Sequence, residues 1–322
     1  MDELYIIVNP LAKNGYGLAI WKKVELGLIK EKVPYQVFFT EYAGHAKKIA
    51  ELIGKNAPQA TIVAVGGDGT IHEVINGLID FPKVKVGFIP GGSGNDFSRG
   101  FSIPKDPITA VQSLFQWLKA EPNYVDLGKV VNARSEKSYF INNMGAGFDA
   151  VIASEANRSR LKALFNRFSM GTVVYAIILI KQLFSYKCTD VVIDVDGKQY
   201  YFPATWFVTV ANQPYYGGGM MISPDACPND GILNLIVVHN LSKIKFLAVF
   251  ISVFWGGHIR FKEVITLKGK KMTITPTRPL PLHSDGESAG HTPVTIEIIH
   301  KSLPVLSGSL VNSKSGEGAE RG

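Results

Sequence analysis

The chain of 322 residues carries a formal net charge of +7, with 46% hydrophobic and 19% charged residues. This composition excludes a largely disordered chain and is typical of a soluble globular protein long enough for two domains. Its two cysteines, Cys188 and Cys227, provide neither a disulfide framework nor a metal-ligand spacing. No apolar run approaches the roughly 20 residues that span a bilayer, and the first residues lack the features of a signal peptide. We therefore expect a cytoplasmic protein.

The positive charge fits a nucleic acid, an anionic lipid surface or an ordinary solvated surface. No recognisable nucleic-acid motif accompanies the charge, so we expect no nucleic-acid partner. The lipid surface and the solvated surface both stay open.

The first part of the chain alternates predicted strands and helices. Apolar strands are predicted at residues 4–8 and 35–40, with a helix at 18–30 between them. Thr40 ends the second strand and is a candidate N-cap for a helix at 46–53. Alternating elements of this kind predict a parallel sheet covered by helices.

A loop is predicted at residues 11–17, before the first helix. Gly15 and Gly17 could supply the first two glycines of a dinucleotide fingerprint, but Ile20 stands where the third glycine belongs. The pattern therefore disfavours a redox Rossmann site.

The most informative stretch begins with an apolar strand at 61–65. It runs into Gly-Gly-Asp-Gly-Thr at 66–70 and then into a helical pattern at 71–78. A glycine-rich turn between strand and helix aims backbone N–H groups at an anion and places a helix N-terminus behind it. A carboxylate at Asp68 would repel phosphate unless a divalent cation lies between them, which predicts a nucleotide with Mg²⁺.

A second loop of the same kind follows another short strand, at 86–90. Residues 91–99 read Gly-Gly-Ser-Gly-Asn-Asp-Phe-Ser-Arg. Loops at the carboxyl ends of neighbouring parallel strands meet at one crevice. We therefore expect Asp68 and Asp96 to face the same ligand.

The helix after the first loop contains His72 and Glu73, which invite a zinc interpretation. A metalloprotease helix needs a second histidine four residues after the first, and this sequence has Asn76 there. Zinc is therefore rejected.

We place a domain boundary near Leu127, after a predicted helix at 107–119. The first domain spans 1–127, and β-type segments dominate residues 128–307. Residues 308–322 contain almost no core-forming side chains, so we expect a disordered tail.

The second domain contains two predicted helical stretches and two acidic turns. The stretch at 161–184 has a basic start and could rest on anionic lipid or be buried, and an apolar-faced helix is predicted at 241–257. One acidic turn contains Asp230, and the other contains Asp285 and Glu287. From the residues alone, both could be ordinary turns.

Three motifs in order carry a family resemblance: Gly-Gly-Asp-Gly-Thr at 66–70, Pro-Gly-Gly-Ser-Gly-Asn-Asp-Phe at 90–97 and Asp-Gly-Glu at 285–287. They resemble the catalytic domain of diacylglycerol kinases, sphingosine and ceramide kinases and the similar bacterial lipid kinases. The resemblance covers nearly the whole chain. It implies an α/β fold: an N-terminal doubly wound nucleotide-binding domain, similar to that of NAD kinases, joined to a C-terminal β-sandwich-like domain. It also implies ATP and Mg²⁺ as cofactors.

The resemblance assigns roles residue by residue. Asp285 matches the catalytic base, while Asp68, Asp96 and Asp126 match acids that order the metal and its water. The residues matched to the ATP site are Asn9, Pro10, Thr40, Gly66, Gly67, Asp68, Gly69, Thr70, Ser93, Asn95 and Glu287.

The resemblance also points to a structural Mg²⁺ loop. Asp230 matches its carboxylate ligand, and neighbouring backbone carbonyls, taken here as those of Cys227 and Ile232, would complete a site of hard oxygen ligands. An Asp-Gly turn before a strand would look identical in the sequence.

The predicted reaction is transfer of the γ-phosphoryl group of ATP to a lipid hydroxyl at the inner face of the membrane, with diacylglycerol as first choice and phosphatidic acid as product. A sphingoid base or another lipid alcohol is the nearest alternative, and an NAD kinase is less favoured. A nucleotide sensor with a dead site is disfavoured by the four acids Asp68, Asp96, Asp285 and Glu287. A homodimer is left open.

Overall fold

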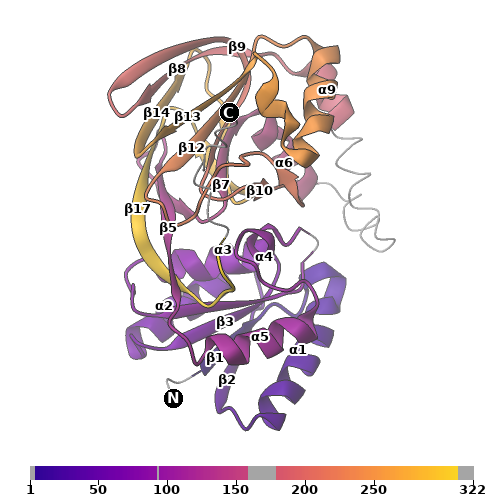
Figure 1. The fold of residues 1–322 in the computed structure, drawn as a ribbon, viewed down its shortest axis with the longest axis vertical. Coiled ribbons are helices and arrows are strands. Elements are labelled where there is room, and N and C mark those ends of the chain that lie inside the picture. Colours follow the sequence, from indigo (N-terminus) through magenta and orange to yellow (C-terminus); the bar gives the residue numbers. More distant parts are fainter. Residues whose placement is uncertain (1–3, 93, 159–178, 311–322) are drawn as a thin grey trace, which may run out of the picture.

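The computed structural model describes residues 4–92, 94–158 and 179–310. Two domains are stacked along the long axis of the molecule (Figure 1). The N-terminal part of the chain forms an α/β domain and the C-terminal part forms a β-sandwich-like domain, which confirms the predicted fold class. Most of the helical stretch predicted at 161–184, and most of the tail predicted at 308–322, lie outside the described residues.

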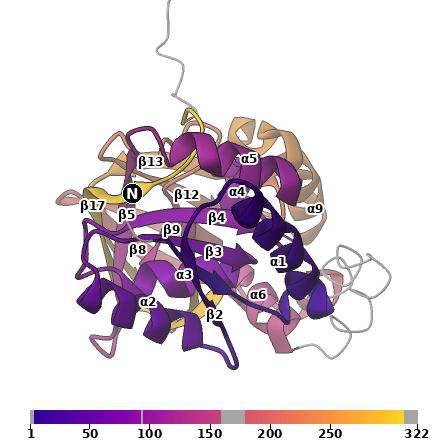
Figure 2. The same cartoon turned by 90° about the horizontal axis from the view of Figure 1, so that it is seen from below.

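The N-terminal domain is built on a parallel sheet in the order β2, β1, β3, β4. Its strands are β1 (Leu4–Val8), β2 (Tyr35–Phe39), β3 (Thr61–Gly66) and β4 (Lys85–Pro90). Its helices are α1 (Ala12–Lys30), α2 (His45–Asn56), α3 (Asp68–Gly77), α4 (Asp96–Gly100) and α5 (Pro107–Trp117). The central strands are apolar and buried because α1 and α5 cover one face of the sheet and α2 and α3 cover the other (Figure 2).

Helix α1 begins at Ala12, so the loop predicted at 11–17 is wrong for most of its length. The glycines that suggested a loop have local uses inside this helix. Gly17 allows close packing, because a Cβ there would collide with the backbone oxygen of Asn9, and Gly15 adopts a positive φ of 92°.

Thr40 does not cap α2. The N-cap of α2 is Gly44, which has no side chain to accept a hydrogen bond from the first amides of the helix. Glu73 of α3 takes over this role, with Oε1 accepting from the amide of Gly44 at 2.7 Å and Oε2 from that of Ala46 at 3.1 Å. A carboxylate from a neighbouring helix therefore satisfies the N-terminus of α2.

The C-terminal domain is dominated by antiparallel strands. They are β5 (Asn123–Val131), β6 (Lys137–Phe140), β7 (Asn143–Gly147), β8 (Thr189–Val195), β9 (Lys198–Ala211), β12 (Leu233–His239), β13 (Val264–Gly269), β14 (Lys271–Pro276), β15 (Pro281–Ser284), β16 (Glu287–His291) and β17 (Val294–Val305). A short hairpin joins β10 (Tyr215–Tyr216) to β11 (Met220–Met221). Alternating apolar side chains from these strands fill one core, and α6 (Phe148–Arg158) and α9 (Lys243–Ser252) contribute to a second.

Two long strands join the domains. β5 leaves the N-terminal domain, and β17 returns antiparallel to it, with one irregularity in the pairing between Ile299 and Leu303. The far end of β17 reaches β4, where Val305 pairs with Val86, so one sheet runs through both domains (Figure 1). This continuous sheet sets the position of the C-terminal domain relative to the loops after β3 and β4.

The helix predicted at 241–257 is shorter than expected. Helix α9 ends at Ser252, and two short 3₁₀ turns follow, η1 (Val253–Trp255) and η2 (Gly257–Arg260). Gly256 separates them with a φ of 73°, which side chains disfavour, so the chain turns there.

Candidate active site between the two domains

The two glycine-rich loops lie side by side where β3 and β4 end. The amide of Gly91 donates to the carbonyl of Gly66 at 2.6 Å. A Cβ on Gly92 would lie 2.6 Å from the Cα of Gly67, so any side chain there would push the loops apart. Because these loops follow neighbouring parallel strands and one of them opens α3, the edge has the features of an anion-binding site.

Several residues predicted to contact ATP lie around these loops. Asn9 donates from Nδ2 to Oγ1 of Thr70 at 3.2 Å, which ties the end of β1 to the first loop. Pro10 follows Asn9 in the turn before α1, and Thr40 is buried just after β2. Oδ1 of Asn95 is buried, and it has no hydrogen-bond partner among the described residues. An orphaned acceptor and a glycine cradle are what a bound nucleotide would complete.

Glu287 approaches the first loop from the C-terminal domain. A Cβ on Gly69 would lie 3.1 Å from Oε1 of Glu287, so the two domains meet at this point. Ser93, also predicted to contact ATP, lies outside the described residues.

Asp68 opens α3 and points into the second glycine loop. Its Oδ1 accepts from the amide of Phe97 at 3.1 Å, and a Cβ on Gly94 would lie 2.7 Å from its Oδ2. Burial and, after it, the charges of Asp96 and Asp285 together raise the pKa of Asp68 to about 6, against two backbone hydrogen bonds that lower it. A carboxylate crowded by other carboxylates favours a cation beside it, so these residues fit Mg²⁺.

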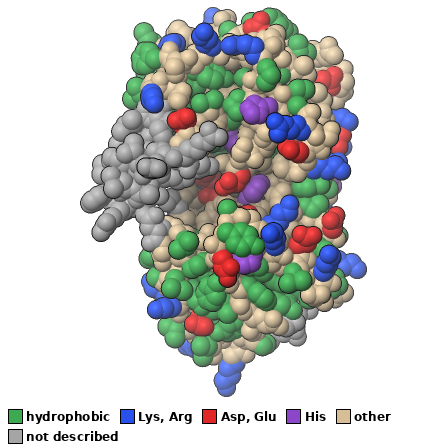
Figure 3. Space-filling view, turned by 180° about the vertical axis from the view of Figure 1, so that it is seen from behind, with side chains coloured by type: hydrophobic (Ala, Val, Ile, Leu, Met, Phe, Trp, Pro, Cys, Tyr) green, Lys and Arg blue, Asp and Glu red, His purple; other side chains and the backbone are tan. Residues whose placement is uncertain are grey.

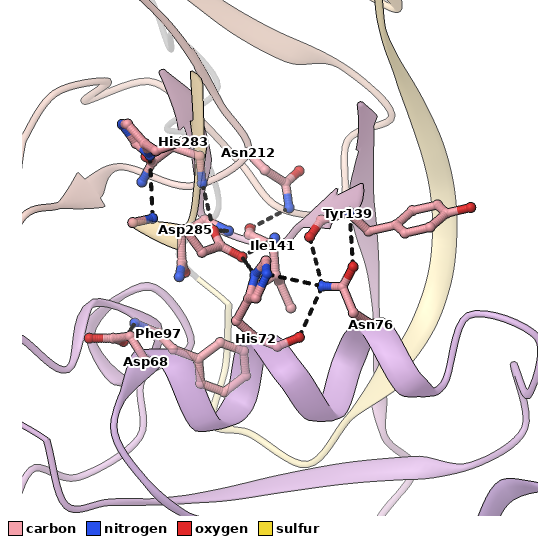
Figure 4. Close-up of polar contacts among 12 residues, drawn as sticks. Asp68, His72, Asn76, Phe97, Tyr139, Ile141, Asn212, His283 and Asp285 are labelled. Atoms are coloured by element: carbon pink, nitrogen blue, oxygen red, sulfur yellow. Dashed lines mark hydrogen bonds and ion pairs between the residues drawn. The ribbon is translucent and has the colours of Figure 1, made fainter. Parts of the chain in front are cut away.

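Asp285 lies in the tight turn between β15 and β16, with a φ of 50°. Its Oδ1 accepts from the amides of Asn142 and Asn143 at 2.9 and 3.1 Å. Its Oδ2 accepts from the amide of Ile141 at 3.0 Å and lies 3.0 Å from Nδ1 of His72 (Figure 4). The carboxylate is therefore tied to the C-terminal domain by the backbone and to the N-terminal domain by one side chain.

Helix α3 brings these groups together, because Asp68 and His72 lie one turn apart on it (Figure 4). Asp68 faces the glycine loops, and His72 reaches Asp285 in the other domain. From behind, acidic and histidine side chains gather in a hollow between the domains (Figure 3). The structure thus places Asp68, Asp285 and Glu287 around one interdomain site.

Asp96 has protein partners on both carboxylate oxygens. Oδ1 accepts from Nη1 of Arg99 at 2.8 Å, and Oδ2 accepts from the amide of Gly218 at 2.8 Å, in the hairpin between β10 and β11. Burial raises the pKa of Asp96, although these hydrogen bonds lower it. These contacts connect the two domains at Asp96, and its predicted role of ordering metal-bound water stays a prediction.

Asp126 is fully buried in β5 and is also committed to the protein. Oδ1 accepts from the amide of Lys301 at 2.6 Å and lies 2.8 Å from Nδ1 of His300, and Oδ2 accepts from the amide of Gly231 at 2.8 Å. These bonds fasten β5 to β17 and to the turn before β12. Asp126 therefore joins these strands, and the role in ordering the metal and its water that the resemblance implies for it stays a prediction.

The turn at Asp230 is compatible with both predictions made for it, a structural Mg²⁺ loop and an ordinary Asp-Gly turn. Oδ1 of Asp230 accepts from the amide of Ile232 at 3.0 Å, which is the hydrogen bond of an Asx turn. Burial, followed by the charge of Asp126, raises the pKa of Asp230, and a cation would relieve that penalty. Cys227 lies nearby, with Sγ 3.1 Å from Oδ1 of Asn229. No cluster of three or more His, Cys, Asp or Glu side chains suited to a metal occurs in the described part of the chain. A metal here would therefore depend on the carbonyls of Cys227 and Ile232, which stays a prediction.

Sequence reasoning considered His72 only for zinc and missed its contact with Asp285. The available signal was its position four residues after Asp68, which places both side chains on one face of a helix. His283 was missed in the same way. Its Nδ1 accepts from the amide of Gly286 at 3.3 Å, and its Nε2 lies 3.4 Å from Oδ2 of Asp149, so it supports the turn that carries Asp285.

Comparison with known proteins identifies the family of both domains. A model of the diacylglycerol kinase catalytic domain matches residues 3–130, and a model of the YegS C-terminal NAD kinase beta sandwich-like domain matches residues 142–307. The chain belongs to the bacterial diacylglycerol kinase and lipid kinase family. As a member of this family, it is a lipid kinase, a phosphotransferase with an alcohol acceptor.

Relatives in this family match over nearly their whole length. A protein of Bacillus subtilis (strain 168), provisionally named as the lipid kinase YtlR, is 33% identical over 297 residues, which are 91% of this chain and 96% of the relative. The diacylglycerol kinase of the same organism is 30% identical over 314 residues, covering 95% and 96% of the two chains. A crystal structure of a diacylglycerol kinase from Bacillus anthracis str. Sterne, 23% identical, covers 95% of this chain and 97% of its own with a TM-score of 0.70. That likeness shows the shared family fold.

Proposed function

We propose that this lipid kinase transfers the γ-phosphoryl group of ATP to the hydroxyl of diacylglycerol, giving phosphatidic acid. The observation that supports it best is the approach of Asp68, beside two glycine-rich loops, to Asp285 across the domain boundary. Relatives named diacylglycerol kinase support the choice of substrate.

In the proposed reaction, each of these residues has a separate task. When bound, ATP with Mg²⁺ supplies the phosphoryl group and the positive charge that offsets the charge developing on it. The glycine loops hold the phosphates through backbone N–H groups, and Asp68 attracts the cation. Asp285 accepts the proton of the attacking hydroxyl, since an alcohol is a poor nucleophile until that proton leaves.

A parallel assay tests the substrate. Purified protein would be incubated with radiolabelled ATP and diacylglycerol, sphingosine or NAD, each with and without Mg²⁺. The proposal expects Mg²⁺-dependent label in the organic phase with diacylglycerol. Strong label with sphingosine alone would point to a sphingoid-base kinase, and label on NAD alone would refute the lipid assignment.

We also propose that the enzyme meets its substrate at an anionic membrane surface through an exposed apolar face of α9 and η1. Among the described residues, no helix is long and apolar enough to cross a membrane. Ile244, Ile251 and Trp255 are exposed and follow one another at helical spacing, while Phe246 and Val249 face the core. An exposed apolar helix face of this kind is typical of interfacial binding.

The charge around this face favours anionic lipid over other occupants. Residues 241–262 contain Lys243, Lys245, Arg260 and Lys262 and no acidic residue. Lys245 is paired with Glu263 at 2.6 Å, and Lys243 lies 5.7 Å above the ring of the exposed Phe184. Basic side chains bordering exposed aromatic and aliphatic groups match the headgroups and acyl region of an anionic bilayer.

Replacing both Ile251 and Trp255 by serine is expected to weaken binding to phosphatidylglycerol vesicles about tenfold or more, because the apolar area that enters the interface is lost. Vesicle co-sedimentation measures this without turnover. The matched control replaces Leu26 and Ile29 of α1, which are equally exposed in the N-terminal domain, by serine. Equal loss in both variants, or a change in oligomeric state without a change in vesicle binding, would contradict the proposed surface.

A further inference from the structure

All of the strong acceptor positions on Asp285 are occupied. A carboxylate offers about four such positions, and here three are filled by the amides of Ile141, Asn142 and Asn143 and the fourth by Nδ1 of His72. The side chain of Asp285 is only 1% exposed. A base must offer an acceptor position to the hydroxyl that it deprotonates. One of these four bonds must therefore yield before Asp285 can act.

The four partners differ in how readily they move. Ile141 and Asn142 connect β6 to β7, and Asn143 is the first residue of β7. Because β7 is hydrogen-bonded to both β9 and β15, these amides are held by the sheet. His72 is a side chain on α3 in the other domain, 12% exposed. It can lengthen its bond to Asp285 by rotating about its own side-chain torsions. The hydrogen bond from His72 is thus the one that can be replaced by a hydrogen bond from the substrate hydroxyl.

The protonation of His72 follows from its partners. Asp285 accepts from three amides, so its Oδ2 is an acceptor and Nδ1 of His72 carries the proton. Asn76 is held in one orientation, because its Oδ1 accepts from the amide of Tyr139 and its Nδ2 donates to the carbonyls of His72 and Tyr139. Nε2 of His72 lies 3.4 Å from Nδ2 of Asn76, on the edge turned away from Asp285 (Figure 4). His72 therefore donates a hydrogen bond to Asp285 through Nδ1.

We propose that His72 is the positioning residue of Asp285: it holds Oδ2 across the domain boundary and sets, through its own protonation, how readily that oxygen takes up the proton of the alcohol. This inference rests on the proposed function. In the reaction, the O–H bond of the alcohol breaks and its proton passes to Oδ2 of Asp285. The alcohol oxygen bonds to the γ-phosphorus, and the bond from that phosphorus to ADP breaks.

The charges around His72 predict the direction of the pH effect. Burial lowers the pKa of His72, but the hydrogen bond and charge of Asp285, with the charges of Glu287 and Glu73, more than reverse this, so the net shift is upward. A charged imidazole competes with the alcohol proton for Oδ2, and a neutral one competes less. Turnover should therefore rise as the pH increases through the raised pKa of His72.

The kinetic test compares three variants with the wild type between pH 6 and 9. His72→Leu removes both the competition for Oδ2 and the bond that holds this oxygen toward the N-terminal domain. Because the loss of positioning is the larger effect, kcat is expected to fall about 10- to 100-fold with little change in KM for ATP. His72→Asn places Nδ2 near the position of Nδ1, so it should recover much of kcat. It should lose the rise of turnover with pH through the pKa of His72, which is the acid limb of the pH profile. His291→Asn, at an exposed histidine, should keep the wild-type profile. A wild-type pH profile and kcat in His72→Leu would overturn the proposal.

The variant Asn76→Ala distinguishes the positioning of Asp285 by His72 from a mere contact between the two domains. Asn76 joins the same helix to β6 through Tyr139, so its loss should lower the melting temperature and leave the acid limb in place. If Asn76→Ala removed that limb as His72→Asn does, His72 would be a docking residue only, which overturns the proposal.

A measurement without substrate distinguishes this inference from the proposed function. In protein with ¹³C-labelled histidine, the resonance of His72, assigned by its loss in His72→Asn, should titrate above the value of a free histidine. In Asp285→Asn, the midpoint should fall because the carboxylate is gone. An unchanged midpoint would overturn the inference even in an active enzyme, whereas the expected shift would support it even if no tested lipid were phosphorylated.

Discussion

Replacing Asp285 by asparagine is expected to lower turnover with the lipid substrate by about 10²- to 10⁴-fold, the usual contribution of a positioned general base. The amide that replaces the carboxylate cannot take up the proton of the attacking hydroxyl. Steady-state kinetics with saturating ATP and Mg²⁺ would measure the loss. Nucleotide affinity should stay close to that of the wild type, because the glycine loops and Asp68 are untouched.

The same substitution has a structural cost that must be measured beside it. Oδ1 of an asparagine could still accept from the amides of Asn142 and Asn143, but its NH₂ group would face the amide of Ile141. One donor facing another costs about 1–3 kcal/mol. The melting temperature should therefore fall modestly while ATP binding persists. Turnover within tenfold of the wild type, in a variant that binds ATP, would remove Asp285 from the role of base.

Replacing Asp68 by asparagine is expected to abolish most turnover and, without ligand, to stabilise the fold. Activity should fall about 100-fold or more, because the carboxylate that attracts the cation is lost. Stability should rise because burial and neighbouring acids raise the pKa of Asp68 from 3.8 to about 6, so the ionised form is unfavourable in the folded state. Asparagine keeps an oxygen for the amide of Phe97.

The sign of this effect depends on pH. A folded-state pKa above the unfolded one means that Asp68 costs no stability below about pH 4. The cost grows as the pH rises and is complete above about 6. A shift of about two units corresponds to at most about 3 kcal/mol, and partial exposure of the side chain reduces it.

Melting curves at pH 4 and pH 7.5, with and without ATP and Mg²⁺, would check this prediction. At pH 7.5 the variant should melt above the wild type without ligand, and it should gain less stability from the ligands. At pH 4 the two proteins should melt together. A lower melting temperature at pH 7.5 without ligand would show that the carboxylate of Asp68 stabilises the fold, contrary to the prediction.

The surroundings of Asp68 could be predicted from the sequence, whereas the hydrogen-bond partners of Asp96 and Asp126 could not. Asp68 was placed correctly beside the second glycine loop because both loops follow adjacent parallel strands, and that geometry follows from strand order. Asp96 and Asp126 were expected to face the metal. In the structure their oxygens accept hydrogen bonds from Arg99, Gly218, Gly231 and Lys301, and the role at the metal stays a prediction. A carboxylate looks the same in a sequence whether it binds a cation or caps a distant turn.

The sequence by itself determined the α/β domain, the β-rich domain after it, the two glycine loops and the order of the family motifs, because hydrophobic periodicity and turn chemistry are local. Only the tertiary structure decided which group holds each acid. His72 and Asp285 are 213 residues apart and meet because β5 and β17 form one sheet through both domains. Hydrogen bonds of buried carboxylates depend on such long-range docking, which leaves no periodic signal along the chain.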